Sequence, residues 1–302
     1  MNIIRMTGGL GNQMFQYALY LKLRSMGKEV KFDDITEYGL ANARPIMLWA
    51  FGITYPRADK AEINEITDGS RKLAHRIRRK LFGRRSREYH EKDCNFDPQV
   101  LLQEDAYLTG YFQSEKYFKD IEQQVRQAFA FSDGIWQRAG AGRKEKTEGY
   151  LLQIKNCESV SLHIRRGDYL EMASVYGGIC TEEYYQKAVT LMEEELPGAK
   201  FFIFSNEPAW AKQWASRIYG EDGRFTVIEG TTEDKGYLDM LLMSRCRHHI
   251  IANSSFSWWG AWLNGSPGKK VIAPALWLRG QDYIDIFTEG MIRVNGEGRL
   301  AG

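Results

Sequence analysis

The second half of the chain alternates between short apolar segments and amphipathic segments, and this alternation restricts its fold more than any other feature. Ser159–Ile164 is short and β-rich, which predicts a buried strand. The predicted elements after it are the helix Glu182–Glu195, strand Phe201–Phe204, helix Ala209–Arg217, strand Phe225–Ile228, helix Asp234–Met243, strand His249–Ala252, helix Ser257–Leu263 and strand Lys270–Ala273. Strands that alternate with helices form a parallel sheet covered on both faces. This half is therefore predicted to be an α/β domain.

The first half begins in a similar way. Ile3–Met6 predicts a strand, and a glycine-rich turn follows it. Apolar residues then recur at helical spacing from about Gln13 to Met26, and Val30–Asp33 predicts the next strand. This order indicates a second domain of Rossmann type. It is not the dinucleotide fingerprint, because Met14 stands where the third glycine would be.

A polar stretch between Ser132 and Asn156 separates the two halves. We place the domain linker in or just after this stretch, which predicts an N-terminal domain over residues 1–150 and a C-terminal domain over residues 151–302. With 302 residues, 43% of them hydrophobic, the chain is long and apolar enough for two cores.

Charged residues follow the predicted strand Ser159–Ile164 directly, at Arg165, Arg166 and Asp168. Open α/β sheets bind ligands at the carboxyl ends of their strands. Two guanidinium groups there suit a phosphate or diphosphate, because arginine offers a fixed fork of donors that stays charged. The alternative is a solvent-facing salt bridge between Arg166 and Asp168. His163 lies inside the predicted strand, so two roles stay open for it: a core histidine, or a residue that contacts the ligand directly.

Two other turns carry hydrogen-bonding groups without charge. The glycines of Gly8–Gln13 let backbone N–H groups approach a ligand at a helix start, although a tight turn capped by Asn12 would have the same sequence. Asn253–Phe256 ends one predicted strand and begins a helix, which favours an anion site. Ser205 and Asn206 follow another predicted strand, where they either bind a base or ribose or cap the next helix.

Together, three stretches resemble the α-1,2-fucosyltransferases, family 11 of the glycosyltransferases. They are Gly8–Ala18, His163–Tyr169 and Ala252–Leu263, and the similarity runs in order over most of the chain. The resemblance implies two Rossmann-like domains facing a cleft, the glycosyltransferase B-type fold. The N-terminal domain would lie on the acceptor side and the C-terminal domain would bind GDP-fucose. The implied reaction is inverting transfer of L-fucose from GDP-β-L-fucose to the 2-hydroxyl of a galactose in an oligosaccharide or glycolipid.

The resemblance also implies roles for individual residues. Arg165 would offset charge on the β-phosphate as the sugar leaves, with Asn12 near the fucosyl group or its leaving oxygen. Arg166 and Asp168 would hold that geometry. The full set expected to bind the donor is Gly9, Gly11, Gln13, His163, Arg165, Arg166, Asp168, Ser205, Asn206, Asp239, Asn253, Ser254, Ser255 and Phe256. Asp239 either contacts the guanine edge or reaches solvent, and no carboxylate in the three stretches is an obvious general base.

The tryptophans at the end of the third stretch have two interpretations. Trp258, Trp259 and Trp262 recur at helical spacing in an apolar helix, which favours core packing over stacking on a sugar.

Missing motifs narrow the chemistry further. The chain has no Asp-x-Asp, so we expect no metal ion and no cofactor, with GDP-fucose as a co-substrate. It has no P-loop either. Two alternatives stay open. One is a fucosyl linkage of another kind, because the arginine motif is shared with α-1,6 and protein O-fucosyltransferases. The other is a non-catalytic module that binds nucleotide sugars or glycans.

Charge and hydropathy bear on location. The net charge of +2 is too small to indicate nucleic acid, and no apolar run reaches the roughly 18 residues of a membrane span. A strand pattern starts at once, without a signal peptide, so we expect a cytoplasmic protein of bacterial type.

Arg71–Arg87 stands apart from the rest of the chain. It has no acid, and its basic residues are Arg71, Lys72, Arg76, Arg78, Arg79, Lys80, Arg84, Arg85 and Arg87. Leu73, Ile77, Leu81 and Phe82 give it an apolar edge at helical spacing. Such a helix either lies on the inner, anionic face of a membrane or is a solvated helix that merely packs on its own domain.

Overall fold

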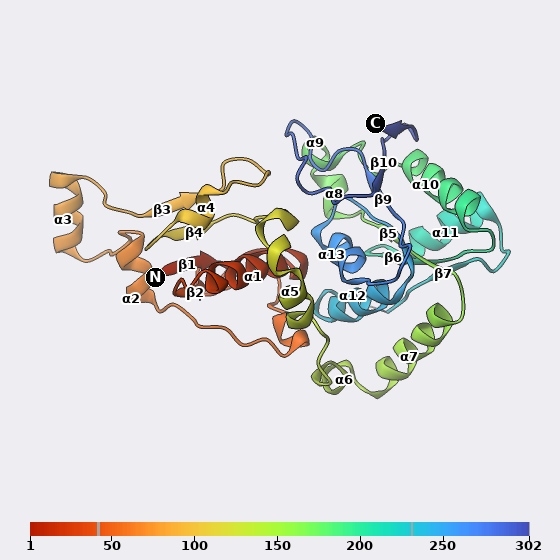
Figure 1. The fold of residues 1–302 in the computed structure, drawn as a ribbon, viewed down its shortest axis with the longest axis horizontal. Coiled ribbons are helices and arrows are strands. Elements are labelled where there is room, and N and C mark those ends of the chain that lie inside the picture. The colour runs from red at the N-terminus through yellow and green to blue at the C-terminus, as the bar shows by residue number, and fades with distance from the viewer. Residues whose placement is uncertain (41–42, 231, 302) are drawn as a thin grey trace. The chain divides into compact units, whose positions relative to one another are not determined.

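The structure is a computed structural model that describes residues 1–40, 43–230 and 232–301, except for the side chains at 168 and 170. It divides into two compact units, Met1–Ala130 and Phe131–Gly302, each with its own sheet (Figure 1). The predicted α/β class is confirmed.

The boundary after Ala130 lies earlier than the expected one at residue 150. Helices α6 (Gly134–Ala139) and α7 (Ala141–Lys155) pack with each other, and α7 packs against α12 (Gly236–Arg245) of the second unit. Ile154 of α7 joins a buried cluster there. The segment has a linker-like composition because α7 buries little else besides Thr147, so most of its positions are polar.

The first unit is built on a four-stranded parallel sheet in the order β2-β1-β4-β3. Its strands are β1 (Asn2–Arg5), β2 (Val30–Asp33), β3 (Glu88–His90) and β4 (Tyr107–Thr109). Its helices are α1 (Leu10–Ser25), α2 (Lys60–Ile66), α3 (Leu73–Phe82), α4 (Gln99–Leu102) and α5 (Glu122–Ala128), with 3₁₀ turns at Leu48–Phe51, Glu115–Tyr117 and Lys119–Ile121. Ile3 and Ile4 of the central strand β1 are fully buried, which places the core beside it.

Helix α1 starts earlier than the sequence predicts. Gly9 is its N-cap, and the chain leaves the helix at Met26 and Gly27, where Gly27 has a φ of 80°. Asn12 therefore lies in the first turn and does not cap the helix. Without a Cβ, Gly27 adopts the left-handed conformation that commonly ends a helix, as the sequence predicts.

The second unit is built on a seven-stranded sheet in the order β11-β10-β9-β8-β5-β6-β7. Its strands are β5 (Ser159–Ile164), β6 (Lys200–Ser205), β7 (Phe225–Val227), β8 (His248–Ile250), β9 (Val271–Pro274), β10 (Met291–Val294) and β11 (Leu300–Ala301). All pairs are parallel except β10–β11. From β5 the chain builds outward through β6 and β7, then returns to the other side of β5 with β8. The order therefore reverses between β5 and β8, where such sheets bind ligands.

Helices connect these strands, which confirms the predicted alternation. They are α8 (Asp168–Glu171), α9 (Ala173–Tyr176), α10 (Glu182–Glu195), α11 (Pro208–Tyr219) and α13 (Ser255–Leu263), in addition to α12 and the 3₁₀ turn Glu233–Lys235. Trp258, Trp259 and Trp262 of α13 are buried, so the core interpretation of these tryptophans is confirmed.

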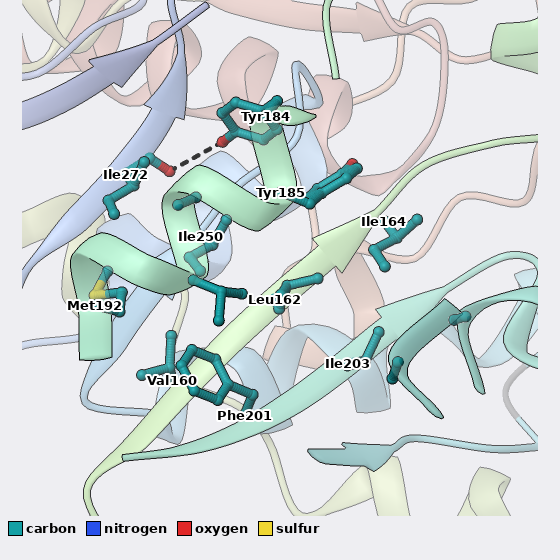
Figure 2. Packing of buried hydrophobic residues seen from close by; sticks show 14 of the residues in the cluster. Val160, Leu162, Ile164, Tyr184, Tyr185, Met192, Phe201, Ile203, Ile250 and Ile272 are labelled. Carbon is teal, nitrogen blue, oxygen red and sulfur yellow. Dashed lines mark hydrogen bonds between the residues drawn. The ribbon is translucent and has the colours of Figure 1, made fainter. Parts of the chain in front are cut away.

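The main core of the second unit lies between the sheet and α10 and α11 (Figure 2). Val160, Leu162 and Ile164 of β5 are fully buried there, and Tyr184 of α10 donates a hydrogen bond from its hydroxyl to the carbonyl of Ile272, at 3.4 Å. All six residues of β5 are buried, as expected for a strand covered on both faces. The carboxyl end of β5 is therefore held on a rigid base.

Candidate functional site

Three of the predicted stretches meet at neighbouring strand ends of the second unit. β5 pairs with β6 on one side and with β8 on the other. Arg165 and Arg166 leave the end of β5, Ser205 and Asn206 stand at the end of β6, and the run from Asn253 follows β8 into α13. The structure thus brings together residues separated by up to about ninety positions, at the point where the strand order reverses.

Arg166 is held firmly by the protein itself. Its Nε donates to Glu207 Oε2 at 3.0 Å, and its guanidinium carbon lies 3.8 Å from the centre of the Trp210 ring. Asn206 binds the backbone of the same residue in both directions, accepting from its N–H at 2.9 Å and donating to its carbonyl at 3.0 Å. Arg166 therefore fixes the turn that carries Arg165.

The alternative pair of Arg166 with Asp168 lies outside the described side chains. Among the described side chains, Arg166 pairs with the carboxylate of Glu207, which comes from the start of α11. Asp168 begins α8, and its side chain lies outside the described part of the structure. Gly167 between them has a φ of 60°, and a Cβ there would lie 2.8 Å from Asn206 Nδ2. The turn therefore requires glycine.

His163 and Arg165 lie two residues apart at the end of β5 and are close enough for the charge of Arg165 to act on the imidazole. His163 is 6% exposed, and its ring centre lies 5.9 Å from that of Phe256 in α13. Burial first, and then the charge of Arg165, lower the pKa of His163 to about 3, so the ring is neutral at physiological pH. Within the described residues its buried Nδ1 has no hydrogen-bond partner. In a core histidine, a buried ring nitrogen is normally hydrogen-bonded within the protein, so the lack of a partner for Nδ1 favours a contact with a ligand.

Arg165 is half-buried, and its guanidinium carbon lies 5.3 Å from the centre of the Tyr169 ring. Tyr169 in turn donates from its hydroxyl to the carbonyl of Asn253 at 3.0 Å. The ring thus links the end of β5 to the run that leads into α13.

The start of α13 has the form of an anion site, but its residues differ in role. Ser254 is the N-cap and accepts from the N–H of Phe256 at 3.3 Å, and Ser254, Ser255 and Phe256 are half-buried. Asn253 is almost fully buried. It donates from Nδ2 to the carbonyl of Trp277 at 3.0 Å, and the Cys180 thiol donates to its Oδ1 at 3.4 Å. Its side chain therefore positions the turn, which argues against the expected direct contact with the donor.

Ser205 and Asn206 also have structural contacts. The Ser205 hydroxyl accepts from the N–H of Glu207 at 3.0 Å, just before α11, as the capping interpretation predicts. Asn206 binds the Arg166 backbone as described above. Their predicted contact with a base or ribose stays a prediction. Asp239 lies half-buried in the first turn of α12. Gly236, at the start of the same helix, faces Phe256: a Cβ on Gly236 would lie 3.7 Å from the Phe256 ring.

In the first unit, the glycine-rich turn packs more tightly than the sequence suggests. Gln13 is fully buried and donates from Nε2 to the carbonyls of Gly8 and Pro45, each at 3.0 Å, while its Oε1 accepts from the N–H of Met47 at 2.9 Å. From the sequence, we expect Gln13 to contact the sugar donor, but such a contact would break these hydrogen bonds. Gly11 is likewise buried inside α1.

Gly8, Gly9 and Asn12 lie nearer the surface of this turn. Asn12 Oδ1 accepts from Gln113 Nε2 at 2.7 Å. Gly8 has a φ of 76°, and a Cβ there would collide with the Asn12 amide. The Arg44 guanidinium lies over Gly9, 3.2 Å from where a Cβ would be. The predicted role of Asn12 near the leaving oxygen stays a prediction.

Sequence reasoning missed Arg44, Gln113 and Glu91, which have no motif around them. Glu91 follows the edge strand β3 and accepts from the backbone N–H groups of Tyr111 and Phe112, at 2.7 and 3.0 Å. It thereby shapes the loop that carries Gln113 to Asn12. Burial raises the pKa of Glu91 to about 7, against the opposite effect of the two backbone donors.

No helix within residues 1–40, 43–230 and 232–301 is long and apolar enough to cross a membrane. Over the same ranges, no three or more His, Cys, Asp or Glu side chains are grouped so that they could hold a metal ion.

Comparisons with known proteins point to one family. The sequence profile described as glycosyl transferase family 11 matches residues 77–281, more than half of the chain. The alpha-1,2-colitosyltransferase of Escherichia coli is 31% identical over 97% of this chain and 98% of its own length. The galactoside alpha-(1,2)-fucosyltransferase 2 of Gorilla gorilla gorilla is 26% identical over 94% of this chain and 74% of its own.

A solved structure shows the same fold. A mutant of Arabidopsis thaliana FUT1 in complex with GDP aligns with a TM-score of 0.51 at 11% identity, covering 89% of this chain and 69% of that one. The likeness confirms the expected glycosyltransferase B-type fold class.

Proposed function

The chain belongs to glycosyl transferase family 11 and is a glycosyltransferase, and we propose that it transfers L-fucose from GDP-β-L-fucose to the 2-hydroxyl of a galactose, with inversion. The observation that carries this proposal is the grouping of His163, Arg165 and the start of α13 where the strand order reverses. A guanidinium and a helix N-terminus both favour an anion, so the diphosphate of the donor fits this edge. The acceptor would be a galactose-terminated oligosaccharide or glycolipid.

The two arginines would divide the work of leaving-group stabilisation. Negative charge grows on the β-phosphate as the bond from the sugar to its oxygen breaks, and Arg165 would offset that charge. Arg166, fixed by Glu207, Trp210 and Asn206, would keep the turn rigid so that Arg165 needs no rearrangement during the reaction. The N–H groups at the start of α13 would bind the same diphosphate.

The imidazole of His163 supports nucleotide binding rather than proton transfer. With a pKa of about 3 it is neutral throughout the working pH range, so it is a poor proton acceptor there. Its buried Nδ1 is instead suited to one hydrogen bond with the nucleotide part of the donor.

The reaction would need no metal ion, because Arg165 and the α13 N-terminus supply the positive charge that a metal supplies elsewhere. We therefore expect unchanged transfer in excess EDTA. The measurement is the initial rate with and without chelator, followed by addition of Mg²⁺ or Mn²⁺. Loss of transfer with EDTA and its recovery with either ion would contradict the metal-free mechanism.

The direct test of the activity is product analysis. The chain is incubated with GDP-fucose and a small panel of galactosides, GDP release is measured, and the linkage is assigned by NMR. An α-1,2 product is expected, with slow GDP release when no acceptor is present. A different linkage would support the alternative fucosyltransferases, whereas GDP-fucose binding without any release of GDP would support a non-catalytic module.

A second candidate donor is the colitosyl counterpart of GDP-fucose, favoured by the 31% identity with a colitosyltransferase. Colitose lacks the 3-hydroxyl of L-fucose. A site that binds this hydroxyl rejects the deoxy sugar strongly, because its buried polar groups would be left unpaired. The ratio of kcat/KM for the two donors under identical conditions decides between them.

A further inference from the structure

Helix α3 turns its apolar side toward solvent. Leu73, Ile77 and Leu81 are four residues apart, so they form one stripe along the helix. Leu73 and Leu81 are 69% and 68% exposed, and Ile77 is 50% exposed. Phe82, at the end of the helix, is 69% exposed. A helix on a globular domain normally buries such a stripe. The exposure of the stripe agrees with both interpretations of this segment, a helix on a membrane surface and a solvated helix, and the charge around it distinguishes them.

The opposite side of α3 holds it to the first unit. Arg79 follows Ile77 by two positions, about 200° around the helix, and donates to the carbonyls of Asp68 and Ser70 at 2.8 and 2.7 Å. Arg78 pairs with the Asp68 carboxylate, which also accepts from the N–H of Arg85 at 3.0 Å. These donors, the Arg85 N–H above all, lower the pKa of Asp68 to about 2, so the anchor stays ionised. Ionic contacts thus fix the outward direction of the stripe.

The segment that carries α3 is closed at its base. The N–H of Arg87 donates to the carbonyl of Ile66 at 2.9 Å, and Ile66 belongs to a buried cluster with Ile3 and Tyr107. The residues between Ile66 and Arg87 therefore leave the domain and return to the same place, next to the edge strand β3. Figure 1 shows α3 standing off from the four-stranded sheet.

The charge on this segment is unbalanced. Among the described residues, Arg71, Lys72, Arg76 and Lys80 have no carboxylate within ion-pair distance, and all four are exposed. The whole chain carries a net charge of only +2, so this concentration of positive charge is local. Apolar residues on one side, bordered by long basic side chains, are typical of helices that lie in the interface of an anionic bilayer.

We propose that α3 binds the surface of an anionic lipid bilayer, with Leu73, Ile77 and Leu81 inserted at the acyl boundary. Arg76 and Lys80, one position before Ile77 and Leu81, border the stripe and reach the headgroups, because long basic side chains extend from an apolar surface to a polar one. The Asp68 anchor keeps the helix in this orientation before it meets the membrane. Membrane contact is independent of the transferase proposal, because none of these residues belongs to the strand-end site.

The test is co-sedimentation of the full chain with vesicles of phosphatidylcholine alone or mixed with phosphatidylglycerol, without donor or acceptor. One variant removes the stripe (Leu73→Ser, Ile77→Ser and Leu81→Ser). Another removes the charges (Arg71→Gln, Lys72→Gln, Arg76→Gln and Lys80→Gln). Matched controls change exposed residues elsewhere, either Leu102, Leu152 and Leu300 to Ser or Lys60, Lys92, Lys212 and Arg245 to Gln.

We expect binding to the anionic vesicles only, weakened at least about tenfold in each α3 variant and within about twofold in both controls. The estimate is conservative, since each basic residue near an anionic surface contributes about fivefold. Equal binding by the α3 variants and their controls would overturn the proposal, as would equal binding of the wild-type chain to neutral vesicles.

Two further measurements keep the test independent of folding and of function. Circular dichroism and melting should be unchanged in the α3 variants, and single Ile77→Ser replaces the triple variant if that one unfolds. Transfer to a soluble galactoside should also be unchanged, so failure of the transferase proposal leaves the vesicle result intact. A different outcome would overturn the proposal: the wild-type chain binds no vesicles but self-associates in sedimentation velocity, and the stripe variant does not self-associate. The surface would then bind a second copy of the chain.

Discussion

The turn after β1 and the turn after β5 have the same place in their own sheets, but their polar side chains serve different purposes. Each follows the first strand of its unit, which is paired on both sides. After β1, Gln13 and Gln16 are fully buried, and Gln16 donates to the carbonyl of Gly110 at 3.0 Å. After β5, Arg165 and Arg166 stay half-buried.

The difference shows how a polar residue in a motif can build a loop instead of binding a ligand. Gln13 uses both of its N–H donors within the protein and also accepts there, so no donor is left for a substrate. His163 keeps Nδ1 without a partner in the described structure, next to the cationic Arg165. Hydrogen-bond satisfaction therefore separates the two turns better than their sequences do, and four substitutions test that distinction.

The largest effect is expected for Arg165→Lys. Lysine keeps the charge but loses the planar two-donor fork. If Arg165 holds the β-phosphate mainly as it leaves, kcat should fall on the order of 10²–10³-fold, or about 3–4 kcal/mol, with little change in GDP affinity. The melting temperature should stay nearly unchanged, because a half-buried arginine at a strand end adds little to folding. Steady-state kinetics beside a thermal melt measure both.

A near-wild-type kcat for Arg165→Lys would show that the leaving group is stabilised elsewhere. Ser254, Ser255 and the start of α13 would then be the next residues to replace.

Gln13→Leu should act on folding instead. It leaves the buried N–H of Met47 without its partner and removes the bonds to the carbonyls of Gly8 and Pro45, of which the Gly8 carbonyl still accepts from the Tyr38 hydroxyl. The loss should cost about 2–3 kcal/mol of stability in the first unit. GDP affinity, measured by calorimetry below the melting temperature, should be unchanged. Asn12→Ala is the matched control in the same turn, since Asn12 is only half-buried and its loss should cost less stability. Loss of GDP binding at an unchanged melting temperature would reverse the roles assigned to the two turns.

Much of the second unit could be predicted from the sequence, because period and composition are local signals. The strand at Ser159–Ile164 and the helix at Glu182–Glu195 are as predicted. Long-range contacts could not be predicted. The sequence near Gln13 does not indicate its hydrogen bond with Met47, and the sequence near Asn253 does not indicate its hydrogen bond with Trp277. The burial of both side chains is therefore visible only in the structure.

The same limit explains the other differences. Helix α7 has a linker-like composition because its packing on α12 buries few of its residues. The pairing of Arg166 with Glu207 joins residues forty-one positions apart, so the sequence around Arg166 does not reveal it. Sequence located the strand ends of the site but not the contacts that distinguish Arg165 from its neighbours.

Arg166→Lys should give a smaller and different loss. Lysine has no Nε–H donor for Glu207 and no planar face for Trp210, so we expect a loss of about 1–2 kcal/mol in stability. The rate should fall less than in Arg165→Lys, since the change acts through the order of the turn. Trp210→Leu is a matched variant that removes the stacking but keeps the arginine. A large fall in kcat for Arg166→Lys without a lower melting temperature would mean that Arg166 contacts the donor directly.

The smallest effect is expected at Glu91, and it depends on pH. The folded chain holds a proton on this carboxyl up to a pKa of about 7, against an ordinary value of 4.5, because burial disfavours the charge. Between those values the folded state binds more protons than the unfolded state, so the contribution of Glu91 to stability falls as pH rises from about 4.5 to about 7. In Glu91→Gln that pH dependence disappears, because glutamine does not titrate. The difference in melting temperature, wild type minus Glu91→Gln, should therefore be most positive near pH 5 and fall toward pH 8, while other titrating groups cancel in the subtraction.

A difference that stays constant across this range would mean that Glu91 titrates normally. The bonds from Tyr111 and Phe112 would then be made to an ordinary carboxylate, and the loop that carries Gln113 to Asn12 would be equally stable throughout this range.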